Sequence, residues 1–113
     1  MRAIAMVLLQ VAVCCLPAAA AGPYPERAVT IVVPYAAGGG IDTVSRLLGQ
    51  RLNERLGQPF VVENRLGGGG VIATAYVAKA ANDGYTLLMA SDAQLAIQVS
   101  LRKNLAYDPI ADF

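Results

Sequence analysis

The stretch that decides the fold is VTIVVPYAAGGGIDT, residues 29–43, in which an apolar run leads through three glycines toward a helix. Residues 29–35 are typical of a strand that is covered on both faces of a sheet. Glycine at the end of such a strand lets the backbone come close to a ligand, and the next helix supplies N–H groups and the positive end of its dipole. The stretch therefore predicts a strand, an anion-binding turn and a helix in succession.

The same arrangement recurs further along the chain. Residues 60–63 form a second apolar run that ends at Asn64-Arg65, and four consecutive glycines, Gly67–Gly70, follow it. The position after a strand favours a second binding turn, although four glycines are equally compatible with a flexible surface loop. Two glycine turns of this kind indicate binding rather than covalent chemistry.

The rest of the chain alternates between strand and helix patterns. Helices are expected at residues 43–56 and 71–81, and a third strand is expected at residues 85–90. Ser91-Asp92 then opens a short helix. This alternation predicts an α/β fold with a parallel sheet, in which ligands bind beyond the carboxyl ends of the strands.

The helix expected at residues 43–56 begins after Asp42, which can cap it, and stops at Gly57. Arg51 and Arg55 fall on the same side of this helix as its apolar stripe. Either the stripe lies at an edge of the fold, where the arginine head groups reach water, or a partner covers it. The stripe consists of Val44, Leu47, Leu48, Leu52 and Leu56.

Residues 1–21 have the pattern of an export signal. Arg2 supplies a positive start, residues 3–16 are almost wholly apolar, and an alanine-rich cleavage zone follows. The apolar run is shorter than the roughly 20 residues of a membrane-spanning helix, so a retained anchor is the less favoured alternative. We therefore expect a signal peptide at 1–21 and a periplasmic mature chain at 22–113.

Composition excludes several classes of function. Cys14 and Cys15 lie within the signal and the chain has no histidine, so the mature part has neither residue type, and we predict no metal, no cofactor and no disulfide. Without Arg2, eight basic residues balance eight acidic ones, which disfavours nucleic acid as a partner. No Gly-x-Ser-x-Gly motif and no activating histidine exist, so we predict no catalytic residues and no enzyme activity.

An oxidoreductase is the alternative that comes nearest. Gly38-x-Gly40-x-x-Thr43 holds two of the three glycines of a dinucleotide-binding fingerprint, and Glu63 stands 23 residues beyond Gly40 at the end of the second strand. The third glycine is missing. Nicotinamide cofactors are also mainly cytoplasmic, which conflicts with an export signal.

Ordered short motifs carry a family resemblance over residues 24–113. They resemble the extracytoplasmic solute-binding receptors of the tripartite tricarboxylate transporter family, often called Bug proteins. The resemblance implies a type II periplasmic-binding-protein architecture of two domains, of which this chain covers mainly the N-terminal part of the first. The motifs are VVPY (32–35), GGG (38–40), LGQP (56–59), VENR (62–65), DGYTL (83–87) and the final Leu105-x-Tyr107-Asp108-Pro109.

The resemblance also implies a function and a binding site. Receptors of this family capture small carboxylates such as citrate, through loop backbone and water more than through charged side chains, and deliver them to membrane transporter subunits; we expect a monomer. From the residues alone, Asp42 and Ser91 can equally be helix caps, and Tyr35 can be ordinary packing. The ligand-binding positions that we predict are Tyr35, Gly38, Gly39, Gly40 and Asp42 in the first ligand loop, and Gly69, Gly70 and Ser91 in further loops.

The chain departs from the family pattern in two ways. Ala37 and Leu66 stand where the family often has proline, and Ile41 stands where it often has threonine or serine. Without the prolines, the backbone of both loops is less pre-organised for binding. Family members are also roughly three times longer, well beyond one small domain. We therefore expect a fragment that folds marginally and binds weakly alone, and a truncated gene product without function is a further alternative.

Overall fold

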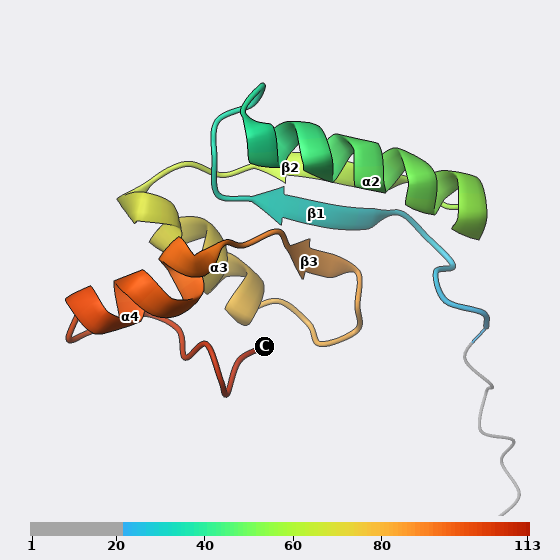
Figure 1. The fold of residues 1–113 in the computed structure, drawn as a ribbon. Helices are drawn as coiled ribbons and strands as arrows, with labels where there is room; N and C mark the ends of the chain where they lie inside the picture. The colour runs from blue at the N-terminus through green and yellow to red at the C-terminus, as the bar shows by residue number, and fades with distance from the viewer. Residues whose placement is uncertain (1–21) are drawn as a thin grey trace, which may run out of the picture.

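The computed structural model describes residues 22–113, so the predictions made for the signal segment and its two cysteines lie outside the described residues. Strands and helices alternate along the chain (Figure 1), which confirms the predicted α/β fold. Among the described helices, none combines the length and the hydropathy needed to cross a bilayer. The elements are β1 (Val29–Val33), α2 (Gly40–Leu56), β2 (Phe60–Asn64), the 3-10 turn η1 (Gly68–Gly70), α3 (Val71–Ala78), β3 (Thr86–Leu88), the π-helical segment η2 (Ala93–Ile97) and α4 (Gln98–Leu101).

The sheet is parallel, with β1 at its centre and the strand order β2-β1-β3. Neighbouring residues of β1 face opposite sides of the sheet. Ile31 lies beneath Gly49 of α2, whereas Val32 packs against α3 through Ala73 and Val77. The two helices therefore cover opposite faces, which buries β1 on both sides as its apolar run predicts.

The strand order also locates a topological switch point. The chain passes from β1 through α2 to β2, then crosses the other face through α3 to β3, on the far side of β1. The direction of winding therefore reverses between β1 and β3, and ligands of open α/β sheets bind at such a reversal, beyond the carboxyl ends of the strands. In the dinucleotide-binding order 3-2-1 the third strand lies beside the second, so this sheet differs from that fold.

Helix α2 begins three residues earlier than expected. Gly39, in an extended conformation, is its N-cap, so the prediction that Asp42 caps this helix is wrong. The predicted end is confirmed, since Gly57 has the left-handed conformation typical of a helix stop. The third strand is shorter than the expected 85–90, because only Thr86–Leu88 pair with β1, and α3 ends at Ala78 rather than at residue 81.

The face of α2 that meets the sheet is not the predicted apolar stripe. The buried positions are Asp42, Ser45 and Gly49, while Val44 and Leu47 remain 59% and 57% exposed. A Cβ at Gly49 would lie 2.9 Å from the Phe60 carbonyl oxygen, so the helix approaches β2 closely only because position 49 has no side chain. Small residues thus set the distance between helix and sheet, and the leucines point elsewhere.

This close approach makes Gly49 sensitive to substitution. We expect Gly49→Val to cost about 1–3 kcal/mol through overpacking. We expect this loss to appear as a lower free energy of unfolding of residues 22–113 at 25 °C, as measured by far-UV circular dichroism in a urea titration. Gln50→Val, which places the same side chain on the exposed side of the helix, is the matched control; equal losses in the two variants would contradict the packing explanation.

Candidate ligand-binding site

Two hydrogen-bonded clusters lie at the carboxyl end of the sheet, and Tyr35 belongs to both. Its carbonyl oxygen accepts a hydrogen bond of 2.9 Å from the side-chain amide of Asn64, which ends β2. Its hydroxyl lies 2.7 Å from the Ser91 hydroxyl, which follows β3. The loops after β1 and β3 therefore meet at the switch point of the sheet, and Tyr35 and Ser91, both predicted site residues, are brought together.

The Asp42 carboxylate is the centre of the first cluster. One oxygen accepts from the Gly38 N–H at 2.8 Å and from Arg46 Nε at 2.9 Å, and the other accepts from Asn64 Nδ2 at 2.9 Å. Arg46 Nη2 also donates to Asn64 Oδ1 at 3.0 Å. With Asp42 only 2% exposed, its charge is directed at internal partners, and these bonds tie the first glycine turn to α2 and β2.

These partners shift the titration of Asp42. The hydrogen bond from Arg46 lowers the pKa of the Asp42 carboxyl far below its usual range, and the Gly38 N–H and the Asn64 amide lower it further. The same interaction raises the pKa of Arg46. The carboxylate therefore stays ionised in the folded chain at acidities that protonate an unfolded aspartate.

A pH dependence of stability follows from this shift. Because the folded pKa of Asp42 is depressed, its contribution is complete above the unfolded pKa of about 3.9 and is lost as the pH falls below it. We expect wild type to be more stable than Asp42→Asn at pH 6 and the difference to shrink steadily below pH 4, as measured by urea unfolding at each pH. Asp92→Asn, which removes an exposed carboxylate, is the control; a difference that persists unchanged to pH 2 would refute the assignment.

The three glycines of the first turn differ in backbone conformation, in the space around them and in the hydrogen bonding of their N–H groups. Gly38 has φ +87°, a conformation that side chains rarely adopt. Gly40 opens α2 without a positive φ, and a Cβ there would meet no atom within 4 Å. Its N–H has no hydrogen-bond partner within residues 22–113, whereas those of Gly38 and Gly39 bond to Asp42 and to Ala36. Internal packing therefore does not explain a glycine at position 40.

The second glycine turn needs its glycines for conformation. Gly67, Gly68, Gly69 and Gly70 all have positive φ, from 61° to 124°. A Cβ on Gly69 or Gly70 would also collide with the side chain of Gln98 or Gln94, respectively. The Gly70 N–H bonds to the Gly67 carbonyl, but those of Gly68 and Gly69 have no partner in the described chain. The turn thus combines internal structure with N–H groups that remain available.

Gln94 is a central residue of the site that sequence reasoning missed. It is fully buried on η2, and its side-chain oxygen accepts from the Ser91 N–H at 3.0 Å. Its side-chain nitrogen donates to the Tyr35 hydroxyl at 3.1 Å and to the Gly69 carbonyl at 3.2 Å. One amide therefore joins the loops that follow all three strands. The available signal was a pair of glutamines four residues apart, Gln94 and Gln98, in an otherwise apolar segment.

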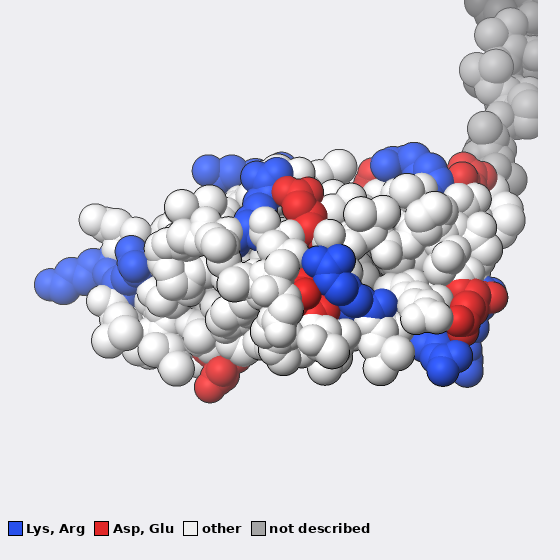
Figure 2. All heavy atoms as spheres, turned by 90° about the horizontal axis from the view of Figure 1, so that it is seen from above, with Lys and Arg blue, Asp and Glu red and all other residues white. Residues whose placement is uncertain are grey.

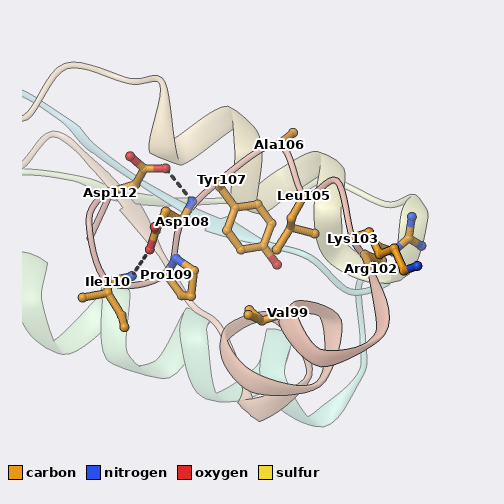
Figure 3. Close-up of a pocket in the computed structure, with 10 residues that line it drawn as sticks. All are labelled: Val99, Arg102, Lys103, Leu105, Ala106, Tyr107, Asp108, Pro109, Ile110 and Asp112. Atoms are coloured by element: carbon orange, nitrogen blue, oxygen red, sulfur yellow. Dashed lines mark hydrogen bonds between the residues drawn. The ribbon is translucent and has the colours of Figure 1, made fainter.

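The grooves on the surface lie away from these two hydrogen-bonded clusters. A groove of about 700 Å³ is lined by Val99, by Arg102 and Lys103, and by the last residues of the chain (Figure 3). A second, of about 400 Å³, lies between α2 and β2 beside Gly49 and Phe60. Neither groove is lined by a predicted site residue. The candidate site is therefore an open edge that lacks an opposite wall within the described residues.

Two features of residues 22–113 bear on metal ions and nucleic acid as ligands: the grouping of metal-binding side chains and the distribution of charge. No group of three or more histidine, cysteine, aspartate or glutamate residues in this range is arranged to hold a metal ion. On the face drawn in Figure 2, basic and acidic side chains are interspersed and no basic stripe forms.

The parallel α/β module with two glycine turns has the fold of solved periplasmic binding proteins: BugD matches it with a TM-score of 0.71 at 43% identity, over 80% of this chain and 30% of BugD. The particular family follows from its sequence: residues 44–113 match the model of the tripartite tricarboxylate transporter family receptor, and the chain belongs to that family. The family resemblance and the fold class predicted from the sequence are both confirmed.

Individual relatives agree with this assignment. BugT of Bordetella pertussis is 46% identical over 93 residues, which cover 81% of this chain and 28% of BugT. The structure of MatC from Rhodopseudomonas palustris with bound malate has a TM-score of 0.71 at 44% identity, over 80% of this chain and 31% of MatC. An R. palustris protein with adipate has a TM-score of 0.68 at 40% identity, over 77% and 29%. The chain thus spans less than a third of each relative.

Proposed function

We propose that this chain is the ligand-loop portion of an extracytoplasmic solute-binding receptor, which captures a small carboxylate and delivers it to a tripartite tricarboxylate-type transporter. Family membership supports the receptor role, and two structural relatives were seen with malate and with adipate. The export pattern of residues 1–21 supports a periplasmic location and a signal peptide ahead of the domain part at 22–113. The role needs no catalytic residue, metal or cofactor, and one receptor molecule is enough for it.

The observation that carries the proposal is the set of N–H groups left free at the carboxyl edge. Gly40 opens the 17-residue helix α2, and Gly68 and Gly69 lead into α3, so these N–H groups lie where helix dipoles favour an anion. Gly38, Gly39 and Gly70 contribute close backbone approach, because their own N–H groups are bonded internally. Tyr35 and Ser91 supply hydroxyls at the same edge. Asp42 serves the site by holding the first turn.

The oxidoreductase alternative fits the structure less well. The sheet order differs from that of dinucleotide-binding folds. Glu63, the candidate for binding a ribose, is ion-paired with Arg65. A ligand-observed NMR experiment with NAD separates the two functions, since a receptor of this kind gives no saturation-transfer signal.

Gly40 gives the sharpest test of the proposal. We expect Gly40→Ala to keep or raise stability, by up to about 1 kcal/mol, because the fold leaves room for the methyl group. It should nevertheless weaken carboxylate binding about tenfold, equivalent to about 1.4 kcal/mol, because the methyl group occupies the approach to the free N–H. Isothermal titration with malate, adipate and citrate measures the affinity, and a thermal melt measures the stability.

Gly38→Ala is the contrasting variant, since its positive φ predicts a loss of stability of about 1–2 kcal/mol. The panel is titrated in parallel into full-length BugT, of which this chain matches 28%. If neither protein binds any acid of the panel, the receptor proposal is contradicted. Unchanged affinity in Gly40→Ala would contradict the role given to the first turn.

A further inference from the structure

Three polar side chains along one side of η2 and α4, which we call the ladder, all donate hydrogen bonds to the second glycine turn. Gln94, Gln98 and Arg102 are spaced four residues apart. Gln94 Nε2 and Gln98 Nε2 donate to the Gly69 carbonyl at 3.2 and 3.4 Å, and Arg102 Nη2 donates to the Gly68 carbonyl at 3.3 Å. Arg102 Nε also donates to Gln98 Oε1 at 2.7 Å, so the members of the ladder support one another.

The bond from Arg102 bears on which way the Gly69 N–H points. In a planar trans peptide the C=O of one residue and the N–H of the next point in opposite directions. The Gly68 carbonyl is directed at Arg102, so the Gly69 N–H is directed away from α4. That N–H has no partner among residues 22–113. A rotation of this one peptide would exchange an exposed donor for an exposed carbonyl, which repels an anion.

Hydrogen bonds within the turn restrain this orientation only in part. Four consecutive glycines have more backbone freedom than any other tetrapeptide of common residues, and their positive φ values are only one of several accessible sets. The backbone hydrogen bonds within the turn run from Gly70 to Gly67 and from Val71 to Gly68, so the Gly68 carbonyl accepts from Val71 as well as from Arg102. Neighbouring side chains therefore add to the restraint that the turn supplies.

We propose that Gln94, Gln98 and Arg102 are the positioning residues of the ligand site: Arg102 holds the peptide of Gly68 and Gly69, and the two glutamines hold the next peptide, of Gly69 and Gly70, so that the Gly69 N–H faces the bound carboxylate. The inference rests on the proposed function for its ligand. Because Gln94 also bonds to Tyr35 and Ser91, the ladder joins the second turn to the loops after β1 and β3. All three loops then keep one arrangement before a ligand arrives.

The test uses residues at the exposed end of the ladder, because replacing the buried Gln94 could unfold the chain. Gln98→Met and Arg102→Met keep side-chain length and helix propensity but remove the donors. Arg102→Lys keeps a donor that can reach the Gly68 carbonyl. Lys103→Met removes a positive charge one residue away, and Lys103 makes no hydrogen bond to the turn within the described chain, so it controls for long-range attraction of an anion.

Two measurements are made on each variant of the whole chain. ¹⁵N relaxation and residual dipolar couplings report the mobility and direction of the Gly69 N–H without a ligand. We expect its order parameter to fall from about 0.85 to below about 0.6 in the two methionine variants, and to stay high in Arg102→Lys and Lys103→Met. Titration with malate and adipate should show affinity about tenfold weaker in the methionine variants only.

The outcomes separate this inference from the proposed function. If the Gly69 N–H keeps its order and direction in both methionine variants, the inference is wrong whatever binds. If it becomes mobile and the affinity of a wild type that binds is unchanged, the link to the ligand is wrong. If wild type and full-length BugT bind neither acid, the proposed function fails, and the NMR measurements alone decide whether the ladder positions the turn.

Discussion

The two glycine turns carry no side chains with which to fix their own conformation, so polar side chains from neighbouring elements do it for them. The Asp42 carboxylate holds the first turn through the Gly38 N–H, and Gln94 holds the second through the Gly69 carbonyl. Both anchors are almost fully buried, where unpaired polar groups are costly, and every buried side-chain polar atom within residues 22–113 has a partner. The shape of the ligand edge therefore depends on hydrogen bonds made behind it.

This arrangement separates groups that build the edge from groups that remain available on it. Side-chain acceptors and donors are consumed internally: Asp42 by Arg46 and Asn64, and Gln94 by Tyr35 and Ser91. Backbone N–H groups remain free beside the hydroxyls of Tyr35 and Ser91, and these N–H groups carry no net charge. An edge built in this way keeps its electrostatic character over a wide pH range, provided that the anchors behind it stay ionised and bonded.

The sequence predicted the fold better than the site. Apolar runs and glycine turns gave the strand and helix order because local pattern reports burial directly. The leucine stripe of α2 is largely exposed, which agrees with the expectation that it lies at an edge or beneath a partner. The sequence did not show which residues of α2 meet the sheet, because the close approach of Gly49 to Phe60 joins distant segments. Gln94 was missed for a similar reason: its bonding partners lie up to 59 residues away, and glutamine on a helix is ordinarily solvated. Which glycine N–H groups are free also depends on such distant partners.

Helix α2 packs small residues against the sheet and leaves its leucines exposed. This packing reflects a competition between a close approach of the helix to β2 and the burial of more apolar surface. Leucines against the sheet would bury more apolar surface, but they would hold the helix axis further from β2 and lengthen the reach from Asp42 to Asn64. With Gly49 in contact with the Phe60 carbonyl, the first turn of α2 sits low enough for its carboxylate to bond directly to the end of β2 at 2.9 Å. The cost is that Val44, Leu47 and Leu48 remain exposed beside Arg51 and Arg55. Close approach of α2 to β2 thus takes precedence over hydrophobic burial along this helix.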